Sequence, residues 1–168
     1  MQAARFEGYG PGGSAVMLDC LTDNRERTAA AVRQAFANHG GHLGADGSVS
    51  YLFQQVGVLG FAPGSDEDAV TDAALDAGAE DVVVRPDGTL EALTAPADLD
   101  AVRGALARRG FVALRREITQ RSATSAVLEH GAAVTLLGLL AALERLEGVQ
   151  HVYSNAEIPD DVLARIPA

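Results

Sequence analysis

The order of its predicted elements places this chain in the α+β class, as two α/β sandwich domains with one inserted into the other. From Val56 to Thr119 the pattern is strand, helix, strand, strand, helix, strand, which is one complete ferredoxin-like unit. The segments on either side each read strand, helix, strand, so each is half of such a unit. We therefore predict two ferredoxin-like domains: a discontinuous one of residues 1–55 plus 122–168, and an inserted one of residues 56–121.

Pairing each half-unit only with its neighbours in sequence is the alternative arrangement. Such sequential pairing is common in proteins, but here it would leave two fragments with unpaired sheet edges. The insertion is favoured for that reason.

The first half of the discontinuous domain begins with a buried strand. Ser14–Leu21 is mainly apolar and lies between glycines and a polar turn. A helix should follow, because Asp23 and Glu26 have capping-box spacing and apolar residues recur at helical intervals until Gly40. Ser48–Phe53 has alternating side chains and is predicted to form the second strand.

Turn and capping signals separate the elements of the inserted domain. Acidic residues at 66–68 favour a helix start, Gly78 favours its end, and Pro86-Asp87-Gly88 is a strong hairpin signal. The predicted elements are a strand at Val56–Phe61, a helix from Asp66 to Gly78, strands at Asp81–Arg85 and Thr89–Thr94, a helix from Pro96 to Gly110, and a strand at Phe111–Thr119.

The second half of the discontinuous domain contains the most apolar segment of the chain. A short strand near Ser125–Leu128 precedes a helix over Ala133–Leu146, and Val149–Ser154 is the last strand. This helix is apolar on more than one side, so it is either fully buried or partly in contact with a partner, and burial is favoured. A helical turn is expected after Pro159.

The charge balance limits the kinds of partner that the chain can bind by itself. Thirteen cationic residues, all of them arginine, stand against twenty-three acidic ones, which gives a formal net charge of −10. Such a chain lacks the overall positive field that nonspecific nucleic-acid binding relies on. Any contact with a polyanion must therefore be local, or be made by something outside this chain.

The remaining composition predicts a soluble, cytoplasmic protein. No uncharged apolar stretch reaches the roughly 18 residues needed to span a bilayer, so we expect no membrane partner. The N-terminus has no export signal. Cys20 is the single cysteine and cannot form an internal disulfide, which fits a reducing compartment.

The glycine-rich run FEGYGPGG at residues 6–13 could be mistaken for a phosphate-binding loop. Such loops lie between a strand and a helix, whereas this run precedes a strand and lacks the GK[ST] ending. We therefore predict a conformationally fixed turn and no nucleotide cofactor. The glycines assigned to this turn are Gly8, Gly10, Gly12 and Gly13.

The sequence predicts neither a metal centre nor a catalytic site. His39 and His42 are close in sequence, but a zinc ion would need further ligands and only Asp46 is near. Cys20 lies in an apolar strand with no neighbouring histidine, so an inert core thiol is favoured over a nucleophile. No Ser-His-Asp order and no HExxH motif is present. We expect no enzyme activity and no cofactor.

One cationic cluster is a candidate nucleic-acid-binding edge. It lies beside the glycine turns, where phosphates could approach the backbone closely. Its members are Arg25, Arg27, Arg33, His39 and His42. A solvated helix face is the alternative, and the residues alone favour that alternative.

Several motifs together resemble the YebC/PmpR family. They are FEGYGPGG, CLTDNRERT, HGGHLGADGSVSYLF, DAALDAGAEDV, TAPADLDAVRGAL and VQHVYSNAEIP, and they extend over almost the whole chain. Bacterial members of this family are described as transcriptional regulators, and the mitochondrial relatives are translational activators.

The resemblance implies a non-enzymatic regulator of gene expression that binds DNA. A ribosome-associated translation factor is the first alternative, and a small-molecule-sensing ferredoxin-like module is the second. Family members usually begin with a basic helical domain, whereas this chain begins at Met1, just before the glycine run. The resemblance therefore implies that contacts with DNA, RNA or the ribosome need that missing domain, and self-association is a further expectation.

Overall fold

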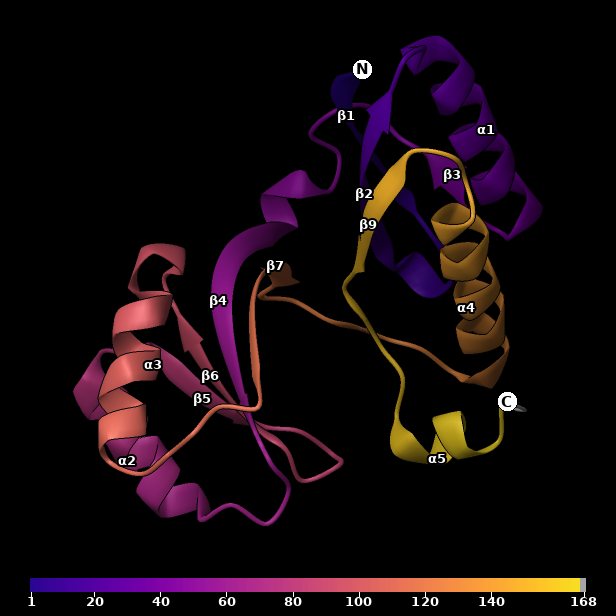
Figure 1. Cartoon of the computed structure of the whole chain (residues 1–168). Coiled ribbons are helices and arrows are strands. Elements are labelled where there is room, and N and C mark those ends of the chain that lie inside the picture. Colours follow the sequence, from indigo (N-terminus) through magenta and orange to yellow (C-terminus); the bar gives the residue numbers. More distant parts are fainter. Residues whose placement is uncertain (167–168) are drawn as a thin grey trace. The chain divides into compact units, whose positions relative to one another are not determined.

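The computed structural model describes residues 1–166 of the chain, which form an α+β structure with five helices (Figure 1). Residue contacts divide it into two compact units. Unit 1 consists of Met1–Gln54 and the segment from Arg121 onward, and unit 2 is Gln55–Gln120. No helix in the described part of the chain is long and apolar enough to cross a membrane.

Unit 1 is built on a four-stranded antiparallel sheet with the strand order β3-β1-β2-β9. Helices α1 and α4 pack against one face of this sheet (Figure 1). The elements are β1 (Gln2–Tyr9), β2 (Ala15–Thr22), α1 (Arg25–Asn38), β3 (His42–Leu43), α4 (His130–Glu144), β9 (Val149–Ser154) and α5 (Asp160–Ala164). The core between helices and sheet contains Phe6, Leu18, Phe36, Leu136 and Leu139, all of them buried.

Strand β1 was not predicted, and it changes the connectivity of unit 1. A local hairpin joins β1 to β2 through the 3-10 turn η1 (Pro11–Gly13). The segment expected as a sheet strand near Ser125–Leu128 contains β8 (Ala126–Val127), which instead pairs in parallel with β10 (Ala156–Glu157). Strand β1 thus occupies the sheet position that the prediction gave to β8, because a neighbouring strand forms a hairpin at low entropic cost.

The strand predicted at Ser48–Phe53 is also wrong. Residues 50–52 form the 3-10 turn η2 (Ser50–Leu52), and the strand β4 begins only at Phe53. The backbone N–H groups of Val49 and Ser50 donate to the Glu7 side chain and are therefore not free for strand pairing.

Unit 2 follows the order strand, helix, strand, strand, helix, strand, with its sheet ordered β5-β6-β4-β7. Its elements are β4 (Phe53–Phe61), α2 (Glu67–Ala77), β5 (Asp81–Val84), β6 (Leu90–Thr94), η3 (Pro96–Asp98), α3 (Leu99–Arg108) and β7 (Arg115–Ser122). Asp66 caps α2 by accepting the N–H of Ala69, and Gly78 ends it with a φ of 107°. The core lies between the sheet and the two helices, and includes Leu59, Phe61, Leu99 and Leu106.

Candidate functional site

The glycine-rich run is part strand and part turn. Gly12 and Gly13 have φ values of 70° and 75° in η1, which only glycine adopts at little cost, and Gly10 directly precedes this turn. Gly8 does not belong to the turn, because it lies within β1. A β-carbon at Gly8 would lie 2.6 Å from the His42 carbonyl oxygen and 2.8 Å from the Phe36 ring. The glycine at position 8 is therefore required by close packing.

Glu7 fastens the loop of residues 45–52 to β1. Its side chain is only 4% exposed, and its carboxylate accepts the backbone N–H groups of Gly47, Val49 and Ser50 at 2.7, 3.0 and 2.5 Å. The Tyr9 hydroxyl donates to the Ser48 carbonyl oxygen at 3.1 Å and adds a second attachment. The motifs FEGYGPGG and HGGHLGADGSVSYLF are thus two halves of one structural assembly.

The same hydrogen bonds determine the ionisation of Glu7. Burial alone would raise the pKa of its carboxyl group, because burial disfavours the charged form. The backbone N–H groups that favour the carboxylate outweigh this effect, so that the pKa of Glu7 lies below its ordinary value. Glu7 therefore has a structural role as a buried anion.

The N-cap residue of α1 is one position later than the predicted capping box implies. Asn24 is the cap, and its side chain accepts the N–H of Arg27 at 3.1 Å. The prediction that Asp23 and Glu26 form the box is wrong. The Asp23 carboxylate instead pairs with the Arg27 guanidinium at 2.6 Å.

The arginines of the candidate edge leave α1 in different directions. Arg25 and Arg27 lie about 200° apart around the helix, since each residue turns it by about 100°. The guanidinium of Arg25 lies 5.2 Å from the centre of the Phe6 ring and 3.7 Å from the Asp46 carboxylate. Arg27 is held by Asp23 on the other side. These two arginines therefore lie on different sides of α1, and each has an aspartate partner at the protein surface.

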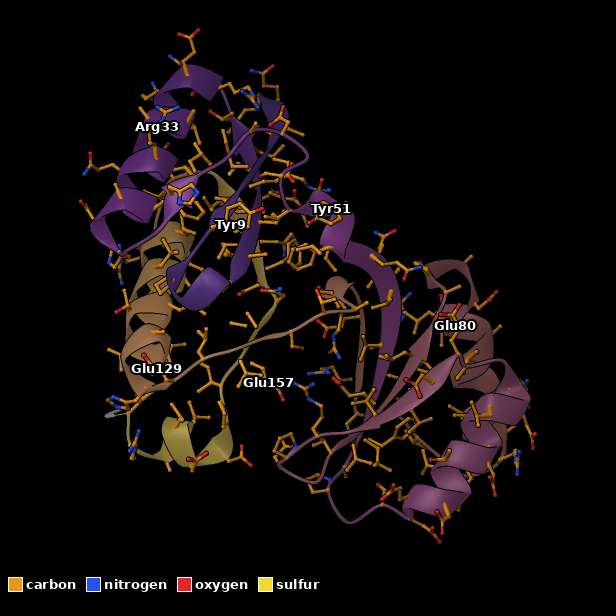
Figure 2. All side chains as sticks on the ribbon, turned by 180° about the vertical axis from the view of Figure 1, so that it is seen from behind. Tyr9, Arg33, Tyr51, Glu80, Glu129 and Glu157 are labelled. Carbon is orange, nitrogen blue, oxygen red and sulfur yellow. The ribbon has the colours of Figure 1, made fainter. Side chains whose placement is uncertain are left out.

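The other three members of the candidate edge differ in exposure. Arg33 is exposed on α1 (Figure 2) and has no ion-pair or hydrogen-bond partner among residues 1–166. His39 is half-buried at the helix end, where its Nδ1 lies 2.9 Å from the Ala35 carbonyl oxygen. His42 is exposed, with its ring centre 5.5 Å from that of Tyr9. Arg33 and His42 are thus exposed, whereas His39 is held at the end of the helix.

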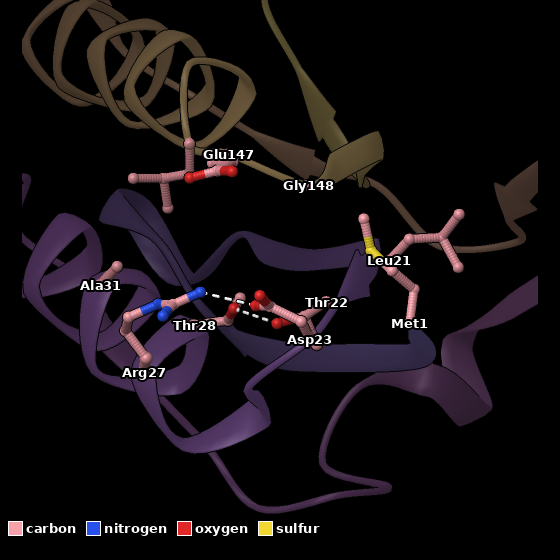
Figure 3. A pocket seen from close by; sticks show the side chains of 10 residues that line it. Met1, Leu21, Thr22, Asp23, Arg27, Thr28, Ala31, Glu147 and Gly148 are labelled. Atoms are coloured by element: carbon pink, nitrogen blue, oxygen red, sulfur yellow. Dashed lines mark hydrogen bonds and ion pairs between the residues drawn. The ribbon is translucent and has the colours of Figure 1, made fainter.

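A pocket of about 280 Å³ lies beside the start of α1 (Figure 3). Its polar wall comes from the CLTDNRERT motif, with the Asp23–Arg27 ion pair and the hydrogen-bonded hydroxyls of Thr22 and Thr28. The α4–β9 connection lies opposite. No motif of the sequence indicates this pocket, because its two walls are more than 100 residues apart in the chain. The lining residues are Met1, Leu21, Thr22, Asp23, Arg27, Thr28, Ala31, Leu146, Glu147 and Gly148.

The described residues contain no group of three or more His, Cys, Asp or Glu side chains placed to hold a metal ion. Cys20 is buried in β2, and this burial raises the pKa of its thiol. A thiol in this environment remains protonated at neutral pH and is a poor nucleophile.

Comparison with known proteins identifies the family. A family model described as the second and third domain of TACO1/YebC matches residues 1–156. The chain belongs to the TACO1/YebC family. This agrees with the family that the motifs indicated from the sequence.

Several TACO1/YebC relatives resemble the chain over nearly its whole length. A probable transcriptional regulatory protein of Pseudomonas fluorescens is 54% identical over 96% of this chain and 65% of its own length. The transcriptional regulatory protein PmpR of Pseudomonas aeruginosa is 51% identical over the same shares of the two chains. The chain thus spans about 65% of the length of the curated relatives it matches.

A crystal structure supports the fold of this TACO1/YebC chain. The conserved hypothetical protein Aq1575 of Aquifex aeolicus is 38% identical and superimposes with a TM-score of 0.78. The match covers 96% of this chain and 67% of the Aquifex protein.

Proposed function

We propose that this protein is a regulator of gene expression that binds nucleic acid and catalyses no reaction. Its similarity to named transcriptional regulators, at 51–54% identity over 96% of the chain, carries the proposal. DNA is therefore the first target. We further propose that residues 56–121 form a ferredoxin-like domain inserted into the other domain, which the strand order β5-β6-β4-β7 supports.

The electrostatics of the two units favour weak, local contact with phosphates. The net charge is −10, and Arg25 and Arg27 are each paired with an aspartate. Few counterions would be released when such a surface meets a duplex. We propose that most phosphate contacts of the whole protein lie outside residues 1–166, and that Arg33 and His42 add local ones.

Replacing Arg33 by alanine should weaken binding to a DNA duplex and lower the salt slope of the affinity by about one, because a phosphate contact is lost. Arg27→Ala is the matched control, since it removes the same charge from the same helix but from an existing ion pair. Fluorescence anisotropy of a labelled duplex at several salt concentrations measures both variants. An unchanged affinity and slope in Arg33→Ala would remove Arg33 from the interface, and no binding by the unsubstituted chain at low salt would contradict DNA binding by these units.

A ribosome-associated translation factor is the second candidate. The description of the matching family model names TACO1 together with YebC, and the mitochondrial relatives that the motifs resemble are translational activators. Co-sedimentation with ribosomes, run beside the duplex assay at the same salt concentration, separates the two candidates. A role in small-molecule sensing would use the pocket beside α1, and it gains support only if neither polyanion is bound.

A further inference from the structure

Within unit 1, no described segment covers one half of the sheet on the side opposite α1 and α4. Side chains alternate between the two faces of a strand, so the neighbours of the core residues Phe6 and Leu18 point to this second face. The loop of residues 45–52 covers one end of it, where Val49 packs with Met17. At the other end, the residues on this face are exposed or partly exposed. They are Ala3, Arg5, Asp19, Leu21 and His151.

Two aromatic rings from β9 lie on this face. The centres of the His151 and Tyr153 rings are 6.0 Å apart and the ring planes differ by 23°, which is an offset stack. Tyr153 is partly buried against the small cluster that contains Met17 and Val49, whereas His151 is exposed. The stack is therefore anchored at its tyrosine end and open to solvent at its histidine end.

A fixed ion pair lies in the same row of the sheet as His151. Arg5 on β1 is directly opposite Asp19 on β2, which in turn is opposite His151 on β9. The Arg5 guanidinium donates to both Asp19 carboxylate oxygens, at 2.7 and 3.1 Å, and its side chain is still 43% exposed. The hydrogen bond to Asp19 raises the pKa of Arg5, although partial burial opposes this effect. Arg5 is thus a permanent cation held beside the aromatic stack.

This combination fits an unpaired nucleobase. Bases of single strands stack on aromatic and histidine side chains of protein surfaces. In a duplex the faces of the bases are already stacked on neighbouring base pairs and cannot make this contact. The guanidinium and carboxylate groups provide the donors and acceptors that base edges require. Stacking also gives affinity without a large positive field, in agreement with the net charge of −10.

We propose that the uncovered sheet face formed by Arg5, Asp19, His151 and Tyr153 binds single-stranded nucleic acid. A base stacks on the open side of His151, and the Arg5–Asp19 pair hydrogen-bonds to its edge. This inference rests on the proposed function, because it names the form of nucleic acid and the surface that meets it.

The test uses the full chain and three labelled probes of equal length: an oligouridylate, an oligothymidylate and a DNA duplex. Fluorescence anisotropy at one low salt concentration measures their affinities. Single strands should bind more tightly than the duplex, and the two single-stranded probes show whether RNA or DNA is preferred. His151→Ala should weaken single-strand binding by about tenfold, as expected for the loss of one stacking contact.

Two further variants control for non-specific effects. His151→Tyr keeps a ring at the same position and should retain binding. Val134→Ala changes an exposed side chain on α4, which covers the opposite face of the sheet, and should leave binding unchanged. The chain has no tryptophan, and all three of its tyrosines lie in unit 1, so quenching of tyrosine emission by the probe gives a second readout without a label.

The outcomes separate this inference from the proposed function. If the unsubstituted chain binds single strands and His151→Ala binds them equally well, the sheet face is not the site, although nucleic-acid binding stands. Binding to the duplex alone overturns the inference and leaves DNA as the target. Binding to none of the three probes contradicts both proposals for this chain.

Discussion

Replacing Glu7 by alanine should lower the free energy of unfolding of unit 1 by about 3 kcal/mol. The substitution removes a buried carboxylate that accepts three backbone N–H groups, and hydrogen bonds to charged groups are the stronger kind. It also leaves those N–H groups without an acceptor in a part-buried loop. Urea unfolding followed by circular dichroism measures the loss. A change below about 0.5 kcal/mol, the usual range for surface substitutions, would show that Glu7 does not hold the loop.

The Glu7 carboxylate also makes stability depend on pH. Its pKa is lower in the folded protein than the ordinary value of 4.5, so its stabilising effect is complete above that value. The effect is lost as the pH falls through the folded-state pKa, because the protonated carboxyl group accepts the N–H groups less well. The difference in unfolding free energy between the unsubstituted chain and Glu7→Gln should be constant at neutral pH and shrink below about pH 4.5. A difference that stays constant under acidic conditions would contradict this role.

Gly8→Ala should destabilise unit 1 by about 2–3 kcal/mol, in the upper part of the range for overpacking a close-packed site. The new β-carbon would lie 2.6 Å from the His42 carbonyl oxygen, and backbone atoms cannot move aside as a flexible side chain can. Gly131→Ala is the matched control: it lies in α4, and a β-carbon there meets nothing within 4 Å. Because alanine is the better helix former, this control should be neutral or stabilising by up to about 1 kcal/mol. Thermal melts that rank the two variants in the opposite order would refute the packing argument.

The sequence predicted correctly those turns and helix ends that are determined by neighbouring residues. The turn at Pro86-Asp87-Gly88, the helix start at the acidic residues 66–68 and the helix end at Gly78 all depend on neighbouring residues, and they lie where expected. Strand β1 was missed because Gly8 interrupts its apolar pattern and because its polar residue Glu7 is buried. The hydrogen-bond partners of Glu7 are 40 or more residues away in the sequence, and a local sequence pattern cannot predict such a contact.

In the candidate nucleic-acid-binding edge, too, contacts between residues far apart in the sequence could not be predicted. The helix that carries Arg25, Arg27 and Arg33 was predicted, and helical geometry alone would have placed Arg25 and Arg27 on different sides. The Asp23–Arg27 pair is also local, because the two residues have i,i+4 spacing. The Asp46 partner of Arg25 could not be derived, since Asp46 lies in a loop that was expected to precede a strand. The contact between the His151 and Tyr153 rings could have been predicted from the sequence, because residues two apart in a predicted strand lie on the same face of the sheet.

Photo-crosslinking tests most directly whether the uncovered sheet face of unit 1 recognises bases. The full chain is irradiated with single strands that carry 4-thiouridine or 4-thiothymidine, and mass spectrometry then locates the adducts. We expect adducts in β1 and β9, concentrated at His151 and Tyr153, and their loss in His151→Ala. Adducts confined to α1 or to unit 2 would contradict the account, because the bases would then be read by a surface other than this sheet.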